Sequence, residues 1–264
     1  MSSTMQLVSI LIILLALATY VIFTQIIRRR RDVPLRPVQA FEQLPLMVGE
    51  SIEAGRPLHA SFGHSGLGGD DTIATLAAAE LFYQVAQRAA LGESMPIITA
   101  SQTSALPVAQ DTLRRAYLSR DRLGNWRPGN ARWHPAPSQP LAFAAALTAT
   151  IGDDRVSGNV LAGSFGPELA LVLDQARRRG TRSVATSVAL EGQAVAYAMA
   201  DSPLIGEEIF TAGGYLGDTA GQRATIVTQD ILRWLLILAI LVPVANTLTD
   251  GALFEAVFRL FEGR

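Results

Sequence analysis

The sequence predicts an α/β fold, a Rossmann-like three-layer domain with a parallel sheet, inserted between two single transmembrane helices. Three observations lead to this prediction. Two strongly apolar segments lie near the two ends of the 264-residue chain. Between them, short apolar segments alternate with longer segments of helical pattern. The short segments are apolar throughout, as is typical of strands that are buried between two layers of helices.

The first apolar segment, residues 5–27, is long enough to cross a bilayer, since a transmembrane helix needs about 20 apolar residues. Its positive charges follow the apolar core, at residues 28–31, whereas a cleaved signal peptide carries its charges in front of the core. We therefore predict an uncleaved transmembrane helix over residues 1–27. A basic, proline-containing juxtamembrane connector with one short helix is predicted over residues 28–57.

The same arginines predict the orientation, because basic residues beside a span remain in the cytoplasm. The α/β domain is then cytoplasmic, at a plasma (inner) membrane, and both termini lie outside. A second transmembrane helix is predicted over residues 230–249, which the chain enters from the cytoplasm at Asp230 and Arg233. Residues 250–264 place their apolar side chains on one helical face. They predict an amphipathic helix on the membrane surface, with packing on a partner protein as the alternative.

Residues 58–225 form the predicted cytoplasmic domain. Its strands are expected at residues 58–63, 95–101, 157–166 and 181–188, with a short further strand around Trp133 in the polar segment 121–140. Its helices are expected at residues 71–93, 106–120, 141–152, 167–180, 191–201 and 202–218.

Composition excludes several classes of function. The chain has no cysteine, so disulfides, thiol nucleophiles and cysteine-ligated metal centres are excluded. The three histidines, His59, His64 and His134, lack the spacing of a metal motif. A net charge of −1 gives no electrostatic basis for nucleic-acid binding.

Four predicted strands are each followed by a turn rich in glycine or hydroxyl side chains. Ligands of parallel sheets bind at the carboxyl ends of the strands, so these turns together predict a small-molecule crevice. The alternative is that the turns use such residues only as caps and turn formers. The candidate ligand-binding residues are Gly63, His64, Ser65, Gly66, Gly68, Gly69, Asp70, Asp71, Thr72, Ser101, Thr103, Ser164, Glu168 and Glu191.

The first of these turns, "GHSGLGGDDT", is not a typical phosphate loop. Its glycine spacing places the third position of a dinucleotide motif on Asp71, and Asp70 and Asp71 put negative charge where a helix N-terminus would hold an anion. In one interpretation, either aspartate caps the helix that follows. In the other, both carboxylates hold Mg²⁺, the one cofactor that the sequence suggests, or bind the hydroxyls or amine of a ligand.

The sequence yields no pair of a nucleophile and a base, although His64 is a candidate for a base or a hydrogen-bonding group. We therefore favour a non-catalytic module that binds a small molecule or a protein partner. One alternative is a Mg²⁺-dependent hydrolase or transferase, for which Asp70 and Asp71 need a third carboxylate, Glu168 or Glu208. Another is a structural subunit of a membrane complex. Small residues in the first span favour a homo-oligomer or such a complex.

Two segments, "FGHSGLGGDDTIATLAAAELFYQVAQRAA" and "DSPLIGEEIFTAGGYLG", lie between the two predicted spans. With them the chain resembles a family of uncharacterised bacterial and archaeal membrane proteins that carry a single domain of unknown function. The resemblance covers most of the chain. It implies a membrane-anchored α/β domain and assigns no residue to a function.

Overall fold

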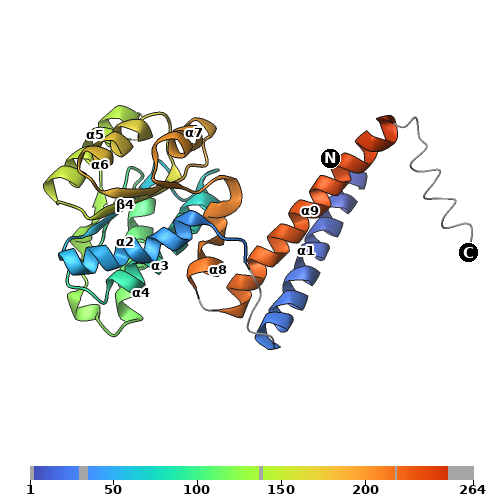
Figure 1. Cartoon of the computed structure of the whole chain (residues 1–264), viewed down its shortest axis with the longest axis horizontal. Helices are drawn as coiled ribbons and strands as arrows, with labels where there is room; N and C mark the ends of the chain where they lie inside the picture. The colour runs from blue at the N-terminus through green and yellow to red at the C-terminus, as the bar shows by residue number, and fades with distance from the viewer. Residues whose placement is uncertain (1–2, 30–34, 137–138, 218, 249–264) are drawn as a thin grey trace, which may run out of the picture. The chain divides into compact units, whose positions relative to one another are not determined.

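The computed structural model describes residues 3–29, 35–136, 139–217 and 219–248. These residues belong to two compact units, which Figure 1 shows as an α/β domain and a pair of long helices. The α/β domain comprises Arg36–Gly217. The helices belong to the second unit, Met1–Leu35 with Asp218–Arg264.

A single sheet of parallel strands forms the centre of the α/β domain. The strands lie in the order β3-β2-β1-β4-β5-β6, and every neighbouring pair is parallel. This order is that of the doubly wound Rossmann sheet, so the predicted fold class is confirmed. The strands are β1 (Leu58–Gly63), β2 (Ile97–Ala100), β3 (Ala131–Trp133), β4 (Gly158–Ser164), β5 (Arg182–Ala185) and β6 (Ser202–Pro203).

Helices cover both faces of the sheet. One layer contains α2 (Gln39–Ala54), α3 (Thr72–Ala89), α4 (Ala105–Leu118) and α8 (Ala212–Leu216). The other contains α5 (Pro140–Asp153), α6 (Leu169–Arg178) and α7 (Leu190–Met199). Successive side chains of a strand point to opposite faces, so Val160 of β4 joins the first core and Leu161 the second. Both are fully buried, which explains why the strand segments are apolar throughout.

The strand order creates a switch point between β1 and β4. From β1 the chain passes through α3 to β2 and through α4 to β3, both on one side of β1. It then crosses by α5 to β4, on the other side of β1. The connections from β1 and β4 therefore diverge, and a crevice forms at their carboxyl ends. Gly63, the last residue of β1, has a φ of 63°, and a Cβ atom there would lie 2.9 Å from the carbonyl carbon of Ser164. The two strand ends therefore approach more closely than a side chain would permit.

Helix α2 is longer than the short helix predicted within the connector 28–57, and it belongs to the α/β unit. Its 16 residues continue through Pro45, and its buried face carries Phe41, Leu44 and Met47 into the first core. Proline inside a helix removes one backbone hydrogen bond, but the burial of this apolar face outweighs that loss. Residues from Arg36 onward therefore belong to the α/β unit.

The segment 202–218 also differs from the predicted helix. Ser202 and Pro203 form the edge strand β6, where proline is tolerated because its missing N–H is not needed. A short 3₁₀ helix (Gly206–Thr211) and α8 follow. The carboxylate of Asp201 accepts hydrogen bonds from the N–H and hydroxyl of Ser183, at 2.8 and 2.9 Å.

The second unit contains the long helices α1 (Ser3–Arg29) and α9 (Ala220–Leu248), which pack side by side and antiparallel (Figure 1). The hydroxyl of Tyr20 in α1 faces Gly221 at the start of α9. By length and composition, Ser9–Arg29 and Ala220–Ala245 could each cross a membrane.

The second helix begins at Ala220 and not at residue 230, because the polar residues before the apolar segment continue the same helix. Asp230 and Arg233 consequently lie inside this helix, where they form an ion pair one turn apart, with 3.6 Å between Asp230 Oδ1 and Arg233 Nη1. The α/β unit ends at Gly217, so the predicted domain end at residue 225 moves back to that point. The predicted surface helix at residues 250–264 lies outside the described residues.

Candidate ligand site

Hydroxyl groups of the protein already accept hydrogen bonds from the backbone N–H groups of the turn after β1. The hydroxyl of Thr72 accepts hydrogen bonds from the N–H groups of Gly68 and Gly69, at 3.0 and 3.2 Å. The hydroxyl of Ser104 accepts one from the N–H of Leu67, at 3.0 Å. A phosphate loop needs such N–H groups free to face the anion. The geometry therefore agrees with the sequence argument against a phosphate cradle.

The helix-capping interpretation of Asp70 and Asp71 agrees with the structure in position but not in hydrogen bonding. Helix α3 begins at Thr72, and Asp71 occupies the N-cap position without a capping hydrogen bond from its side chain. Thr72 closes the turn instead. Neither aspartate carboxylate forms a hydrogen bond or ion pair with another residue that the structure describes. Asp71 is half-buried and Asp70 is exposed, so both carboxylates remain available to a ligand.

A shallow pocket of about 240 Å³ lies at the turns that follow β1 and β2. No lysine or arginine contributes to its lining, whereas two carboxylates do. The potential inside it therefore favours cationic groups and hydroxyl donors over anions. The lining residues are His64, Gly66, Leu67, Gly68, Gly69, Asp70, Asp71, Gln102 and Ser104.

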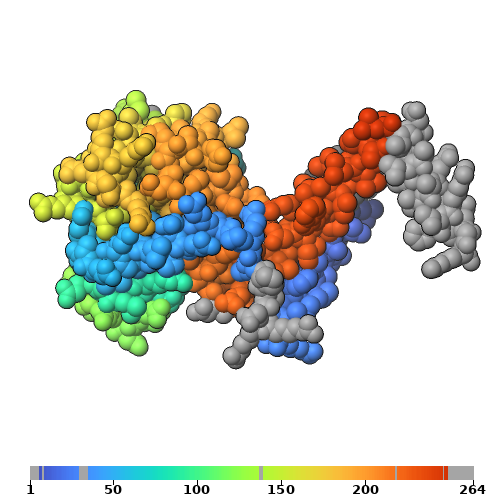
Figure 2. All heavy atoms as spheres, viewed as in Figure 1, coloured from blue at the N-terminus to red at the C-terminus, as the bar shows by residue number. Residues whose placement is uncertain are grey.

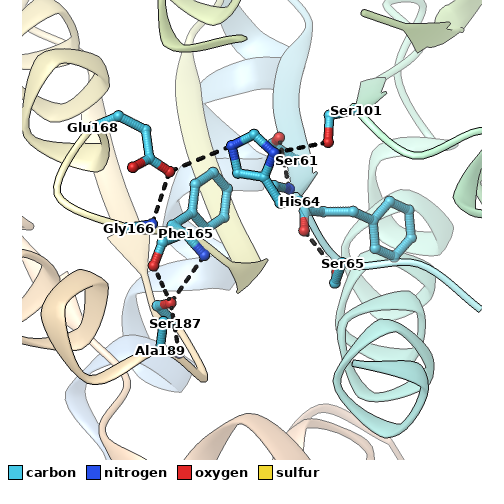
Figure 3. A network of polar contacts seen from close by, with 11 residues as sticks. Ser61, His64, Ser65, Ser101, Phe165, Gly166, Glu168, Ser187 and Ala189 are labelled. Atoms are coloured by element: carbon cyan, nitrogen blue, oxygen red, sulfur yellow. Dashed lines mark hydrogen bonds and ion pairs between the residues drawn. The ribbon is translucent and has the colours of Figure 1, made fainter. Parts of the chain in front are cut away.

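His64 connects this pocket to the ends of β2 and β4 (Figure 3). Its Nδ1 atom lies 3.0 Å from the hydroxyl of Ser101, directly after β2. Its Nε2 atom lies 3.5 Å from Oε1 of Glu168, ahead of α6, and forms no hydrogen bond with a described residue. The ring of Phe143 from α5 lies 5.0 Å from the imidazole, centroid to centroid. Three strand ends and one helix therefore hold the imidazole in place.

Burial determines the charge of His64. Removal from water lowers its pKa below the usual value, although the carboxylates of Glu168 and Asp71 act in the opposite direction. The imidazole is therefore neutral at pH 7. A neutral ring that faces a carboxylate places its proton on Nε2, which leaves Nδ1 free to accept the hydroxyl proton of Ser101.

The turns after β4 and β5 are also joined. The hydroxyl of Ser187 accepts a hydrogen bond from the N–H of Phe165 at 3.0 Å and donates one to its carbonyl at 2.7 Å. The side chain of Glu168 is almost completely buried, and its Oε1 atom accepts a hydrogen bond from the N–H of Gly166 at 2.7 Å. Figure 3 shows these contacts as one network that runs from Ser101 to Ala189.

The structure brings together part of the candidate set that the sequence predicts. His64, Ser101 and Glu168 meet at the switch point, and the Gly66-to-Asp71 turn lines the pocket. Four residues shape the turns: Gly63 and Ser164 by backbone contact, Ser65 by donating to the Phe62 carbonyl, and Thr72 by binding two backbone N–H groups. Two residues lie exposed and away from the pocket lining: Thr103 and Glu191.

The metal site at Asp70 and Asp71 stays a prediction. Among the described residues, no group of three or more histidine, aspartate or glutamate side chains could hold a metal ion. Of the two candidates for a third carboxylate, Glu168 contacts His64, and Glu208 pairs with Arg36 at 2.8 Å. The arrangement that a Mg²⁺-dependent enzyme requires is therefore not assembled in this part of the chain.

Sequence reasoning missed four contributors: Gln102, Ser104, Phe143 and Ser187. Ser104 and Ser187 lie in turns that were expected at this edge, so their hydroxyls were a usable signal. Phe143 lies inside a helix and gives no local sign of contacting His64. Sequence patterns also yield no nucleophile–base pair, whereas the structure places the Ser101 hydroxyl in hydrogen-bond contact with the His64 imidazole.

Comparison with known proteins defines the family. No curated protein and no solved structure matches the chain. A family match covers residues 2–258, almost the whole sequence. The chain belongs to the family described as domain of unknown function DUF6754.

Proposed function

We propose that the chain is a membrane-anchored module whose cytoplasmic α/β domain binds a small molecule at the carboxyl ends of its strands. The observation that carries this proposal is the polar pocket at the turns after β1 and β2, beside the β1–β4 switch point. Doubly wound sheets bind their ligands at this place. The pocket includes two carboxylates that form no hydrogen bond or ion pair with a described residue.

The pocket chemistry favours a ligand that carries an amine or several hydroxyl groups. Asp70 and Asp71 can accept hydrogen bonds from such groups, and Gln102 and Ser104 add neutral polar contacts. An anionic ligand would meet two carboxylates and no basic side chain in the lining. It would also find the N–H groups of Leu67, Gly68 and Gly69 already engaged.

We expect amines, amino acids and sugars, but not nucleotides, to stabilise the full chain in detergent micelles against heat. At a hundredfold excess over its dissociation constant, a ligand should add about 2.7 kcal/mol to the free energy of unfolding. Asp71→Asn should weaken binding about 10-fold or more, because a charged hydrogen-bond acceptor is lost. Asp111→Asn, which removes an exposed carboxylate on α4, is the matched control and should leave binding unchanged.

The same screen with Mg²⁺ tests the remaining metal prediction. A stabilisation by Mg²⁺ alone that disappears in Asp71→Asn would favour a metal site. If no compound stabilises the protein, with or without Mg²⁺, the binding proposal is wrong. A structural role in a membrane complex or homo-oligomer would then be the better interpretation.

The anchoring part of the proposal rests on the two long apolar helices and on the ends of the α/β unit. The two ends of that unit lie close together, since the Tyr215 hydroxyl, two residues before its end, donates a hydrogen bond to the carbonyl of Arg36, its first residue, at 2.7 Å. Tyr215 also stacks on Phe41, with 4.8 Å between ring centroids. Both connections to the helices therefore leave the α/β unit at one place, as attachment to one membrane face requires.

Single cysteines should report this topology without background, because the chain has no cysteine of its own. Ser3→Cys, which lies ahead of the apolar segment 5–27, should react with an impermeant maleimide added to intact cells. A cysteine at Arg120, in the α/β domain, should react only after the membrane is opened. Reaction of the domain cysteine alone in intact cells would show the opposite orientation. Reaction of both cysteines would argue against a two-pass protein.

A further inference from the structure

We infer that Ser101, His64 and Glu168 form a proton relay that makes Ser101 a nucleophile toward small carboxylic esters. The inference goes beyond the proposed binding function but uses the same pocket. It rests on geometry: the hydroxyl of Ser101 lies 3.0 Å from His64 Nδ1, and the opposite ring nitrogen faces Glu168 at 3.5 Å. A nucleophile that contacts a base, which in turn contacts a carboxylate, is the arrangement of a serine hydrolase centre.

Each member is held in place by contacts of its own. The N–H of Ser101 donates to the carbonyl of Gly63 at 3.2 Å, and its carbonyl accepts from the indole N–H of Trp133 at 2.9 Å. The carboxylate of Glu168 is fixed by the N–H of Gly166. Such support reduces the reorganisation that proton transfer would otherwise require.

The protonation states suit the chemistry. Burial keeps His64 neutral at pH 7, so Nδ1 can accept a proton. Glu168 faces the Nε2 side and would stabilise the imidazolium that forms when His64 takes this proton. A merely structural hydrogen bond would not require a buried carboxylate on the far side of the ring.

The reaction balances without a cofactor. The hydroxyl oxygen of Ser101 attacks the ester carbonyl while its proton moves to His64 Nδ1. The bond to the alcohol oxygen then breaks, and His64 returns the proton to the leaving alcohol. Water attacks the acyl-serine with His64 again as base, which releases the carboxylic acid and restores Ser101. Because Asp70 and Asp71 line the pocket, the preferred esters carry an amine or hydroxyl groups.

Ser101 lies behind the pocket wall and not on it. The residue is only 1% exposed, whereas His64 and Gln102 line the pocket. Gln102 follows Ser101 in the chain, is half-buried and has no hydrogen bond through its side chain to a described residue, so we expect a smaller side chain at this position to open the approach. Gln102→Ala should therefore increase the reactivity of Ser101.

A fluorophosphonate probe tests the relay on the full chain in detergent micelles. Attack by Ser101 forms an oxygen–phosphorus bond and expels fluoride, and mass spectrometry of the labelled peptide identifies the residue. We expect labelling of Ser101 that Ser101→Ala abolishes and that His64→Asn slows about 100-fold or more. The asparagine side chain would retain a hydrogen bond to Ser101 without accepting its proton. The labelling rate should rise with pH and level off at neutral pH, as His64 loses its proton.

Controls separate a relay from a structural network. Ser119→Ala, at the far end of α4, should be labelled as fast as the wild-type protein. Thermal unfolding shows which variants are folded. If neither the folded wild-type protein nor Gln102→Ala is labelled at Ser101, or if His64→Asn is labelled at the wild-type rate, the relay is wrong. Labelling without ligand-induced stabilisation would contradict the binding proposal alone, and the reverse result would contradict the relay alone.

Discussion

Replacing Gly192 with alanine should lower the free energy of unfolding by about 3 kcal/mol, near the upper end of the range for overpacked cores. Gly192 lies in the first turn of α7 against the turn after β4. A Cβ atom there would lie 2.7 Å from the carbonyl carbon of Phe165 and 2.8 Å from the hydroxyl oxygen of Ser187. The obstructing carbonyl belongs to the backbone, which cannot move aside as a flexible side chain can.

Gly49→Ala is the matched control for this substitution. Gly49 lies inside α2, and a Cβ atom there would have no neighbour within 4 Å. Alanine is the better helix former, so Gly49→Ala should raise the free energy of unfolding by about 0.5 to 1 kcal/mol. Urea denaturation of both variants in detergent, followed by tryptophan fluorescence, measures the two effects. Equal signs for the two substitutions would contradict the close packing of α7 on the turn after β4.

The Gly192 contact also links packing to the candidate site. Ser187 and Phe165 belong to the same hydrogen-bond network as Glu168 (Figure 3). Displacement of this turn should therefore disturb the contact between Glu168 and His64. Slower probe labelling in Gly192→Ala, at a temperature where the variant is folded, would show this coupling.

Much of the fold could be predicted because its signals are local. The bounds of β1 match the prediction, and the helices and longer strands of the domain were placed within a few residues. Two elements differ from the prediction because tertiary packing overrode the local signal. Helix α2 continues through Pro45, since its apolar face is buried. Strand β6 is a two-residue edge strand within the segment 202–218 that was predicted to be helical. In Figure 2 the atoms of α2 form a blue band across the visible face of the domain.

The candidate site was predictable only in outline. The turn residues identified the correct edge of the sheet, but not which side chains meet there. The contact between His64 and Ser101 spans 37 residues and depends on β1 and β2 being neighbours. The contact with Glu168 depends on β4 lying on the other side of β1. Strand order is not contained in local periodicity, so the relay could not be derived from it.

A second buried network crosses the middle of the sheet and centres on His59, which is completely buried. The amide nitrogen of Asn159 donates to the hydroxyl of Thr181 at 3.0 Å, which turns its carbonyl oxygen toward His59 Nδ1 at 3.1 Å. His59 Nδ1 therefore carries the proton. The other nitrogen, Nε2, accepts a hydrogen bond from the hydroxyl of Thr99 at 2.9 Å. Both ring nitrogens of the neutral imidazole therefore have hydrogen-bond partners. These side-chain contacts link β1 to its two neighbours, β2 and β4.

Protonation would break this network, and burial lowers the pKa of His59 from 6.5 to about 4, although the hydrogen bond to Asn159 acts in the opposite direction. The unfolded chain binds this proton more readily than the folded protein. The stabilising contribution is therefore complete above pH 6.5 and declines as the pH falls toward 4. Its full size is about 3 kcal/mol.

Three other groups contribute to the acid dependence of stability. Burial also lowers the pKa values of His64 and His134, so their contributions decline over the range just below pH 6.5. The hydrogen bond from Arg132 lowers the pKa of Asp154 below 3.8, so its contribution is lost only at lower pH. His59 is therefore expected to dominate between pH 6.5 and 4.

Substitution of His59 should separate its contribution to the pH dependence of stability from those of His64, His134 and Asp154. Between pH 7 and pH 4, the wild-type protein should lose about 3 kcal/mol or more of its free energy of unfolding, as measured by urea denaturation in detergent. His59→Gln removes the titrating group and should eliminate most of that pH dependence, whatever its stability at pH 7. His134→Gln should retain most of it, because His59 is still present. An unchanged pH dependence in His59→Gln would show that His59 does not control acid stability. This holds whatever the packing cost of the substitution, because the comparison concerns the change of unfolding free energy with pH and not its value at one pH.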